Sequence, residues 1–431
     1  MTVSAAVVSS SPIQIAGLPV TVPTDYLGLS ARGWPLYNAA WINGAESGQP
    51  VPTAPSPSPS FLPYVWTRTW DSGYCLWADI ETAPGVYNWT NVDLWITAQR
   101  QAGKSVQWVF CITPTFYADQ VTVLGNGFTA AATAYGAKNT YFGGGGPPSI
   151  AANNSAGVNG LTAVSNFITV LITRYNSASG AWRVANPTLG KGIGAIESWQ
   201  ECTFNGVSEQ WWGSAAQMVD LCYTVKTAAR AVDSSIQWSG PSWNTATSAQ
   251  TFLAASGAVN TGVTAGSLYY PDGNTTFNYH PYNINLPGIQ FGSTWYDLLT
   301  HPVIGINNFR AIMAGATGGS IASVPIQCNE CGFDYNFSST PLTAMQNQPP
   351  QYRYTYWMRA MMVMAAYGVK RWGTYAWDCP FSCYPVNDPN GMQQALIDFA
   401  AHVVGKTIAS ATYVVGGAVT LTFSDSSVYS V

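Results

Sequence analysis

The sequence predicts an α/β protein of the (β/α)8 TIM-barrel class, with a small β appendage formed by its two terminal segments. The chain has 431 residues, a length that suits such a barrel with insertions. Short apolar runs alternate with segments of helical periodicity, and repeated βα units favour a parallel sheet that closes on itself. We therefore expect an N-terminal β segment at residues 1–24, a barrel at 25–405 and a C-terminal β tail at 406–431.

The eight barrel strands are predicted from short apolar runs that stop at polar, aromatic or turn-forming residues. In chain order they lie at Tyr26–Ala31, Tyr64–Trp70, Ser105–Ile112, the start of Gly192–Asn205, Ser235–Gly240, Thr276–Tyr282, Val324–Gly332 and Val369–Asp378. Apolar residues at a spacing of three to four predict the helices between them. These helices are expected at Thr90–Gly103, Leu161–Tyr175, Trp211–Val232, Tyr352–Tyr367 and Gly391–Val404.

Two long connections interrupt the strand–helix pattern. Residues Trp34–Pro63 contain VPTAPSPSPS, and the segment between the third strand and Val158 contains GGGGPPS. Proline and glycine at this density exclude a helix or a strand ladder there. Loops of this length in a compact domain are usually functional or mobile, so each is either a cleft wall or a solvated spacer.

Charged residues make up only 8% of the chain, against roughly 25% in ordinary soluble proteins. The net charge is −4 with no basic tract, so we expect no nucleic-acid partner. No apolar stretch reaches the ~20 residues of a membrane span, and the N-terminus lacks the features of a signal peptide. The Ser-, Thr- and Asn-rich surface nevertheless indicates an extracellular or secreted protein, with a virion component as the alternative. The oligomeric state is left open.

Aromatic residues reach 13% of the chain, with 18 Trp and 24 Tyr. Flat rings stack on the apolar faces of sugars, so a sugar-binding cleft is one interpretation and a Trp-rich core is the other. The eight cysteines are spread too widely for a disulfide framework. CNEC and CPFSC together have zinc-like spacing. We favour buried thiols or a local Cys379–Cys383 bridge, because the CNEC pair falls on a predicted strand whose neighbouring side chains point to opposite faces.

Two glutamates stand at the ends of predicted strands. Glu201 ends the fourth and Glu330 the seventh, and each follows an amide residue, Gln200 or Asn329. Barrel closure can bring such strand ends to opposite sides of one pocket. Two carboxyl groups ~5–5.5 Å apart suit retaining glycoside hydrolysis, in which one protonates the leaving oxygen and the other attacks the anomeric carbon. Glu197, earlier on the same strand, is expected to point into the barrel near Arg68 or another donor, and we favour a structural role for it.

Five motifs resemble segments of clan A glycoside hydrolases, especially of family 39-like members, and they occur in the same order along the chain. ESWQE resembles the E-x-W-N-E segment whose last Glu is the acid/base, which implies that role for Glu201. NECGF resembles the segment that ends in the nucleophile, here Glu330. NYHPY implies that His280 and Tyr282 reach the site, and AWD implies that Trp377 floors a sugar subsite. RTWDSG resembles the second-strand region of these families.

Further substrate-binding residues are expected around the glutamates. They are Gln200, Asn329 and Trp199 on the glutamate-bearing strands and Trp70 and Asp71 after the second strand. A turn is the alternative role for the second-strand pair, and core packing is the alternative for Trp199. The sequence departs from the family pattern at Gln200, where the Asn that holds the sugar 2-hydroxyl is usual, and at Cys202, where Pro is usual.

The sequence thus predicts a retaining, endo-acting β-glycosidase that cleaves a polysaccharide, with a bacterial exopolysaccharide as one candidate substrate. The long, aromatic- and Gly-rich loops favour an open groove over an exo-acting pocket. We expect no cofactor and no metal. The rival hypothesis is a catalytically silent carbohydrate-binding barrel, such as a phage or virion host-recognition protein. A metal hydrolase is a more distant alternative, because the three histidines are scattered.

Overall fold

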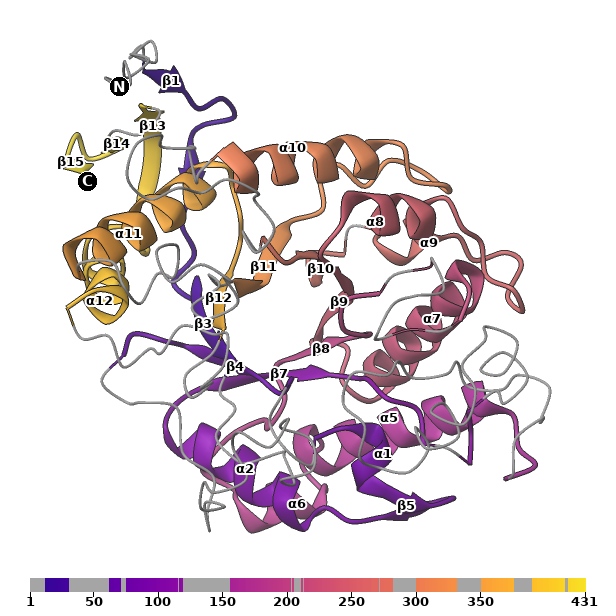
Figure 1. Ribbon diagram of the computed structural model, residues 1–431. Helices are drawn as coiled ribbons and strands as arrows, with labels where there is room; N and C mark the ends of the chain where they lie inside the picture. The colour runs from indigo at the N-terminus through magenta and orange to yellow at the C-terminus, as the bar shows by residue number, and fades with distance from the viewer. Residues whose placement is uncertain are drawn as a thin grey trace, which may run out of the picture.

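The computed structural model shows a barrel surrounded by helices, with a small sheet at one side that holds both chain ends (Figure 1). All structural statements below concern the residues that the structure describes. These are residues 12–30, 62–70, 75–114, 116–118, 156–202, 204, 211, 213–270, 272–281, 300–331, 350–375, 390–414 and 418–431.

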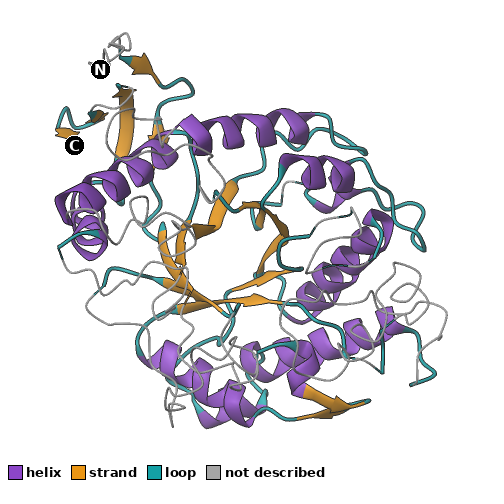
Figure 2. Cartoon of the chain, viewed as in Figure 1, coloured by secondary structure: helices purple, strands orange, loops and turns teal. Residues whose placement is uncertain are grey.

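Eight parallel strands close into one barrel, in the spatial order β10-β11-β12-β3-β4-β7-β8-β9. Figure 2 shows this ring of strands enclosed by the helices. Every strand overlaps its predicted run, so the TIM-barrel prediction is confirmed. The strands are β3 (Leu27–Ser30), β4 (Trp66–Arg68), β7 (Ser105–Val109), β8 (Ala195–Glu197), β9 (Gln237–Trp243), β10 (Thr275–Tyr279), β11 (Ile326–Cys331) and β12 (Trp372–Tyr375).

The five predicted helices are present as α2 (Thr90–Gln101), α5 (Gly160–Asn176), α7 (Ala215–Val232), α11 (Pro350–Ala366) and α12 (Met392–His402). Their starts follow capping chemistry. Asn159 accepts hydrogen bonds from the first amides of α5, and Ser214 forms a capping box with Gln217 at α7. Shorter helices are α1 (Trp77–Ile80), α6 (Ala181–Ala185), α8 (Ala246–Leu253) and α9 (Ala265–Leu268).

The sequence pattern did not indicate α10 (Thr300–Ala314), which lies between β10 and β11. Glycine weakens a helical pattern, and this helix contains Gly305. The glycine has a packing reason, because a Cβ atom there would lie 2.0 Å from the hydroxyl of Tyr279 on β10. Close approach of helix to barrel therefore outweighs helix propensity at this position.

The two ends of the chain form one antiparallel sheet, as predicted. β1 (Ile13–Gln14) and β2 (Val20–Thr21) both pair with β13 (Thr407–Tyr413), and β14 (Val419–Phe423) and β15 (Val428–Ser430) extend it. A separate β5 (Glu81–Ala83) and β6 (Val86–Tyr87) hairpin lies next to α1. The boundaries that we assign to the three segments remain a prediction.

The core is rich in tryptophan. Most tryptophans in the described ranges are buried, including Trp66, Trp95, Trp108 and Trp238. Much of the aromatic content therefore packs between the barrel and its helices, and the composition alone is not a signal for a cleft. Within the described part of the chain, no helix combines the length and apolar character that a membrane crossing needs.

Candidate active site

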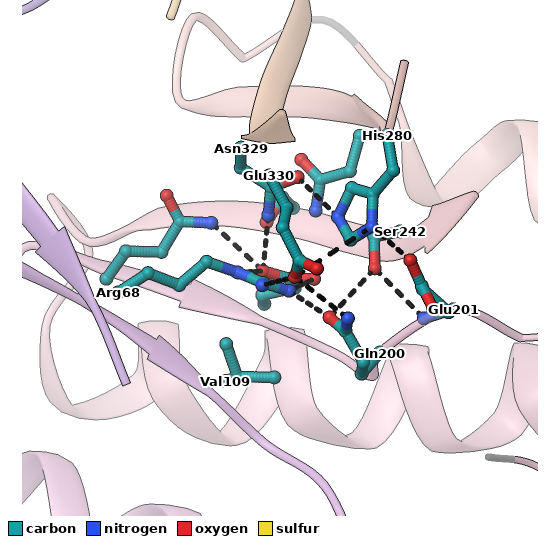
Figure 3. A network of polar contacts seen from close by, with 12 residues as sticks. Arg68, Val109, Gln200, Glu201, Ser242, His280, Asn329 and Glu330 are labelled. Atoms are coloured by element: carbon teal, nitrogen blue, oxygen red, sulfur yellow. Dashed lines mark hydrogen bonds and ion pairs between the residues drawn. The ribbon is translucent and has the colours of Figure 1, made fainter. Parts of the chain in front are cut away.

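The two predicted glutamates meet at the carboxyl end of the barrel (Figure 3). Glu330 lies on β11, and Glu201 lies just after the end of β8. One carboxylate oxygen of each, together with a ring nitrogen of His280, form a group of three atoms within 4.8 Å of one another. The side chain of Glu330 is 6% exposed and that of Glu201 is 20% exposed. The strand-end positions thus deliver both carboxyl groups to one polar pocket.

Local backbone irregularities aim these side chains. On β11 the pairing with β12 shifts register between Cys328 and Cys331, so Asn329 and Glu330 both contribute to the same polar cluster although they are consecutive. After β8, Glu201 has a φ of 39°, a value that non-glycine residues rarely adopt. Such strained residues concentrate at functional sites.

Arg68 at the end of β4 lies at the centre of the cluster and is fully buried. Its guanidinium forms a two-pronged pair with Glu197, with Nε donating to Oε2 at 2.9 Å and Nη2 to Oε1 at 2.7 Å. It also donates to Glu330 and to the side-chain oxygen of Gln200. Burial alone would lower the pKa of Arg68, but the charges and hydrogen bonds of Glu197 and Glu330 outweigh it and raise that pKa. Arg68 therefore stays charged.

The expected position of Glu197 near Arg68 is confirmed. Besides Arg68, its Oε2 accepts from Gln107 Nε2 at 3.1 Å and from Asn329 Nδ2 at 2.6 Å. The carboxylate has no exposed surface. Because a buried carboxylate is stable only when it is paired and hydrogen-bonded, these donors account for its place inside the barrel.

His280 follows β10 and lies between the two glutamate-bearing strands. Its Nδ1 is 2.8 Å from Glu201 Oε1 and 3.9 Å from Glu330 Oε2, and its Nε2 is 3.1 Å from Asn329 Oδ1. The resemblance suggested a position near the nucleophile. The shorter contact is to the predicted acid/base, Glu201.

Gln200 contacts protein groups on both sides. Its Nε2 donates to Glu330 Oε2 at 2.9 Å, and its Oε1 accepts from Arg68 and from Ser242 Oγ, the latter at 3.3 Å. Gln200 is 1% exposed. Gln200 therefore helps to hold the Glu330 carboxylate in position, while Asn329 contacts Glu197 and His280.

The remaining residues predicted for the site are either buried or outside the described part of the chain. Trp199 has no exposed surface and packs edge-on against Phe110 and Trp211, so in this structure it is a core residue and not part of the cleft. The reason is that β8 ends at Glu197, which removes the strand alternation that would have turned Trp199 toward the pocket. Trp70 is buried after β4. Asp71, Tyr282 and Trp377 lie outside the described residues.

Two residues of the cluster were not predicted. Gln107 is a buried amide on β7, within the largely apolar run SVQWVFCI. A polar residue in such a run could have indicated from the sequence that Gln107 points into the polar cluster. Ser242 lies on β9, which continues to Trp243 past the predicted end at Gly240. Its hydroxyl accepts from the backbone N–H of Glu201 at 3.0 Å and so supports the strained residue.

The cluster does not fit a metal ion. Glu201, His280 and Glu330 have the spacing of a three-ligand set, but Arg68 donates to Glu330 in the same place. A cation there would lie beside a buried guanidinium that repels it. Six cysteines in the described ranges are buried free thiols, including Cys328 and Cys331 of CNEC. Cys379 and Cys383 lie outside those ranges.

At the level of sequence, the chain matches no protein-family model and no curated protein. Its fold is similar to solved glycoside hydrolases. One is a family 51 α-L-arabinofuranosidase from Bifidobacterium longum, with 11% identity and a TM-score of 0.51 over 94% of this chain and 77% of that one. Another is a family 39 glycoside hydrolase from Bacteroides cellulosilyticus WH2, with 13% identity and a TM-score of 0.50 over 94% of this chain and 69% of that one.

These similarities define the class of fold. The chain has a (β/α)8 barrel whose fold is similar to those of solved glycoside hydrolases, with a family 39 member among the similar structures. Identities this low establish the fold alone. The chemistry must be inferred from the residues of this site.

Proposed function

We propose that this protein is a retaining, endo-acting β-glycoside hydrolase that cleaves a polysaccharide, with Glu201 as acid/base and Glu330 as nucleophile. The observation that carries the proposal is the spacing of the two carboxyl groups, since one carboxylate oxygen of each lies within 4.8 Å of the other. Retaining enzymes hold their carboxyl groups ~5–5.5 Å apart, whereas inverting enzymes need ~6.5–9.5 Å to fit a water molecule between substrate and base.

The environments of the two glutamates suit different roles. Glu330 accepts from Arg68 and from Gln200 Nε2, and these two donors fix the position of the carboxylate, as a nucleophile requires. Glu201 accepts from neither and is the more exposed of the two, beside His280. It is therefore the group that can hold a proton and pass it to a leaving oxygen.

The reaction would run in two displacements. Glu330 attacks the anomeric carbon, the glycosidic C–O bond breaks, and Glu201 gives its proton to the leaving oxygen. Glu201, now a carboxylate, then takes a proton from a water molecule whose oxygen attacks the anomeric carbon and breaks the ester bond to Glu330. Both glutamates end as they began. No step requires a cofactor.

The endo-acting mode and the extracellular site are parts of the same proposal. The long segments after the first and third strands, rich in Gly and aromatic residues, favour an open groove for a polymer. A charged fraction of 8% favours work outside a cytoplasm, where a bacterial exopolysaccharide is one candidate substrate.

The first test is hydrolysis of a panel of bacterial, plant and algal polysaccharides, with product length and anomeric configuration read by NMR as products form. We expect oligomeric products of retained configuration. Inverted products would refute the double displacement, and binding without any cleavage would favour the rival carbohydrate-binding barrel. Activity is expected to survive a chelator, because the proposed steps use no metal.

The residue roles are tested with Glu201→Ala, Glu330→Ala and a control, Asp425→Asn, which changes an exposed carboxyl group of the terminal sheet. Each active-site variant should lose at least ~10³-fold in kcat, because each removes a reacting group. Azide should rescue both, giving a glycosyl azide of retained configuration with the Glu201 variant and of inverted configuration with the Glu330 variant. If the two azide products had the opposite configurations, Glu201 would be the nucleophile and Glu330 the acid/base. Full activity in both variants would show that neither glutamate is catalytic.

A further inference from the structure

His280 is linked to the buried ion pair through Asn329. Asn329 Nδ2 lies 2.6 Å from Glu197 Oε2, and Asn329 Oδ1 lies 3.1 Å from His280 Nε2. Figure 3 shows Asn329 between the strand that carries Glu330 and the ring of His280. The chain of contacts therefore runs from Arg68 through Glu197 and Asn329 to the imidazole.

The direction of each hydrogen bond in this chain follows from chemistry. Glu197 is paired with Arg68 and ionised, so both its oxygens can only accept. The Asn329 group that faces it must then be the NH2, and the group that faces His280 must be the carbonyl oxygen. A carbonyl oxygen only accepts, so His280 Nε2 must carry the hydrogen.

The other ring nitrogen is fixed by the same reasoning. When His280 is neutral with its hydrogen on Nε2, its Nδ1 is a bare acceptor. That nitrogen lies 2.8 Å from Glu201 Oε1, which as a carboxylate is also only an acceptor. Two acceptors at this distance repel each other unless one proton lies between them. We propose that Glu201 and His280 hold one shared proton, and that His280 is thereby a second acid–base group of the reaction.

This inference rests on the proposed function and deepens it. The pair holds one proton before the reaction, loses it to the leaving oxygen, and regains one from water in the second displacement. Between these steps the carboxylate faces the lone pair of Nδ1, and this repulsion strengthens the pair as a base toward water. His280 therefore assists the second displacement most.

Other charged groups of the cluster lie close to the pair. In the described part of the chain, Glu330 from β11 lies 3.9 Å from His280 Nδ1, and it is paired with Arg68 from β4, which also pairs with Glu197 from β8. Arg68 pairs with both carboxylates and neutralises part of their negative charge beside the pair. The proton belongs to the pair as a whole, and not to one residue.

The inference can be tested without any substrate. The chain has three histidines, so protein labelled with 15N-histidine gives three imidazole spin systems. His280→Gln identifies that of His280. If this variant does not fold, His301→Gln and His402→Gln identify it by elimination. We expect Nε2 to carry a hydrogen over the whole pH range of the folded protein. A hydrogen on Nδ1 with a bare Nε2 would overturn the proposal, whatever the activity.

The second readout is the pH dependence of kcat on the polysaccharide that the panel identifies. In His280→Gln the amide can donate to the Glu201 carboxylate, so the proton is lost at lower pH. Hydrogen bonds to charged groups are worth about one to two pH units, and the alkaline limb should move down by that amount. The control is His402→Gln on an exposed face of α12. A uniform fall in kcat without a shift of the limb would assign His280 a structural role only.

Discussion

Replacing Arg68 tests whether the buried cluster holds the barrel together as well as the site. The side chains of Arg68 and Glu197 have no exposed surface, and that of Glu330 is 6% exposed. In Arg68→Met the apolar stem is retained, but the guanidinium that neutralises both carboxylates is lost. Two buried carboxylates would then lie close together with amide donors but without their cation.

The magnitude follows from the burial of the pair. Breaking a buried ion pair by removing one partner costs about 3–5 kcal/mol, because a charge is left uncompensated. Unfolding entropy near 60 °C is about 2.1 cal/mol/K per residue, which for 431 residues gives about 0.9 kcal/mol per degree. The expected fall in Tm is therefore about 3–6 °C, and activity should be lost because Glu330 is no longer held.

Scanning calorimetry at neutral pH measures this fall. The matched control is Arg174→Met, because Arg174 also pairs with a carboxylate, Asp93, with Nε donating to Oδ1 at 2.9 Å. That pair is 22% and 29% exposed, so its loss should cost at most about 1 kcal/mol, or roughly 1 °C. Equal shifts in the two variants would refute the reasoning that burial sets the cost.

Two further predictions concern other parts of the molecule. Burial alone would raise the pKa of Asp233, but hydrogen bonds from Lys191, Ser235 and Asn176 outweigh it and lower that pKa to about 2. A carboxyl group whose pKa is lower in the folded than in the unfolded state stabilises the fold at any pH above its unfolded pKa. Asp233→Asn should therefore lower the free energy of unfolding by about 2 kcal/mol at pH 7. Calorimetry should show this cost vanishing as the pH falls from about 4 to about 2. Trp199→Phe should lower Tm by roughly 2 °C, because buried ring atoms are lost, and should leave the KM for polysaccharide unchanged. A tenfold rise in KM would show instead that Trp199 contacts the substrate.

The barrel was predictable because its signal is local and repeated. Each strand is an apolar run that ends in polar residues, and parallel strands place all such ends on one side. Glu201 and Glu330 were found for this reason, and so was the pairing of Glu197 with Arg68, since a carboxylate inside a barrel needs a donor. These predictions need only the strand order, and not the detailed backbone.

The remaining features depend on the detailed backbone. The register shift beside Asn329 and the positive φ of Glu201 decide which side chains enter the pocket, and neither has a signature in the sequence. Trp199 was misplaced for the same reason, because alternation fails once a strand has ended. Ser242 was missed because its role depends on a hydroxyl meeting one backbone N–H of another strand.

Gln200 shows how one methylene group can change the use of a site. The family pattern has Asn here, and the resemblance implied a side chain that holds the sugar 2-hydroxyl. In this structure both ends of the longer side chain contact protein groups: its Nε2 donates to Glu330 at 2.9 Å, and its Oε1 accepts from Arg68 and Ser242. An amide with both ends committed to protein groups gains little by turning to a substrate, because its partners would be left unsatisfied in a buried place. Gln200 therefore acts with Arg68 to hold the proposed nucleophile, and under the proposed function recognition of the sugar 2-hydroxyl would come from other residues.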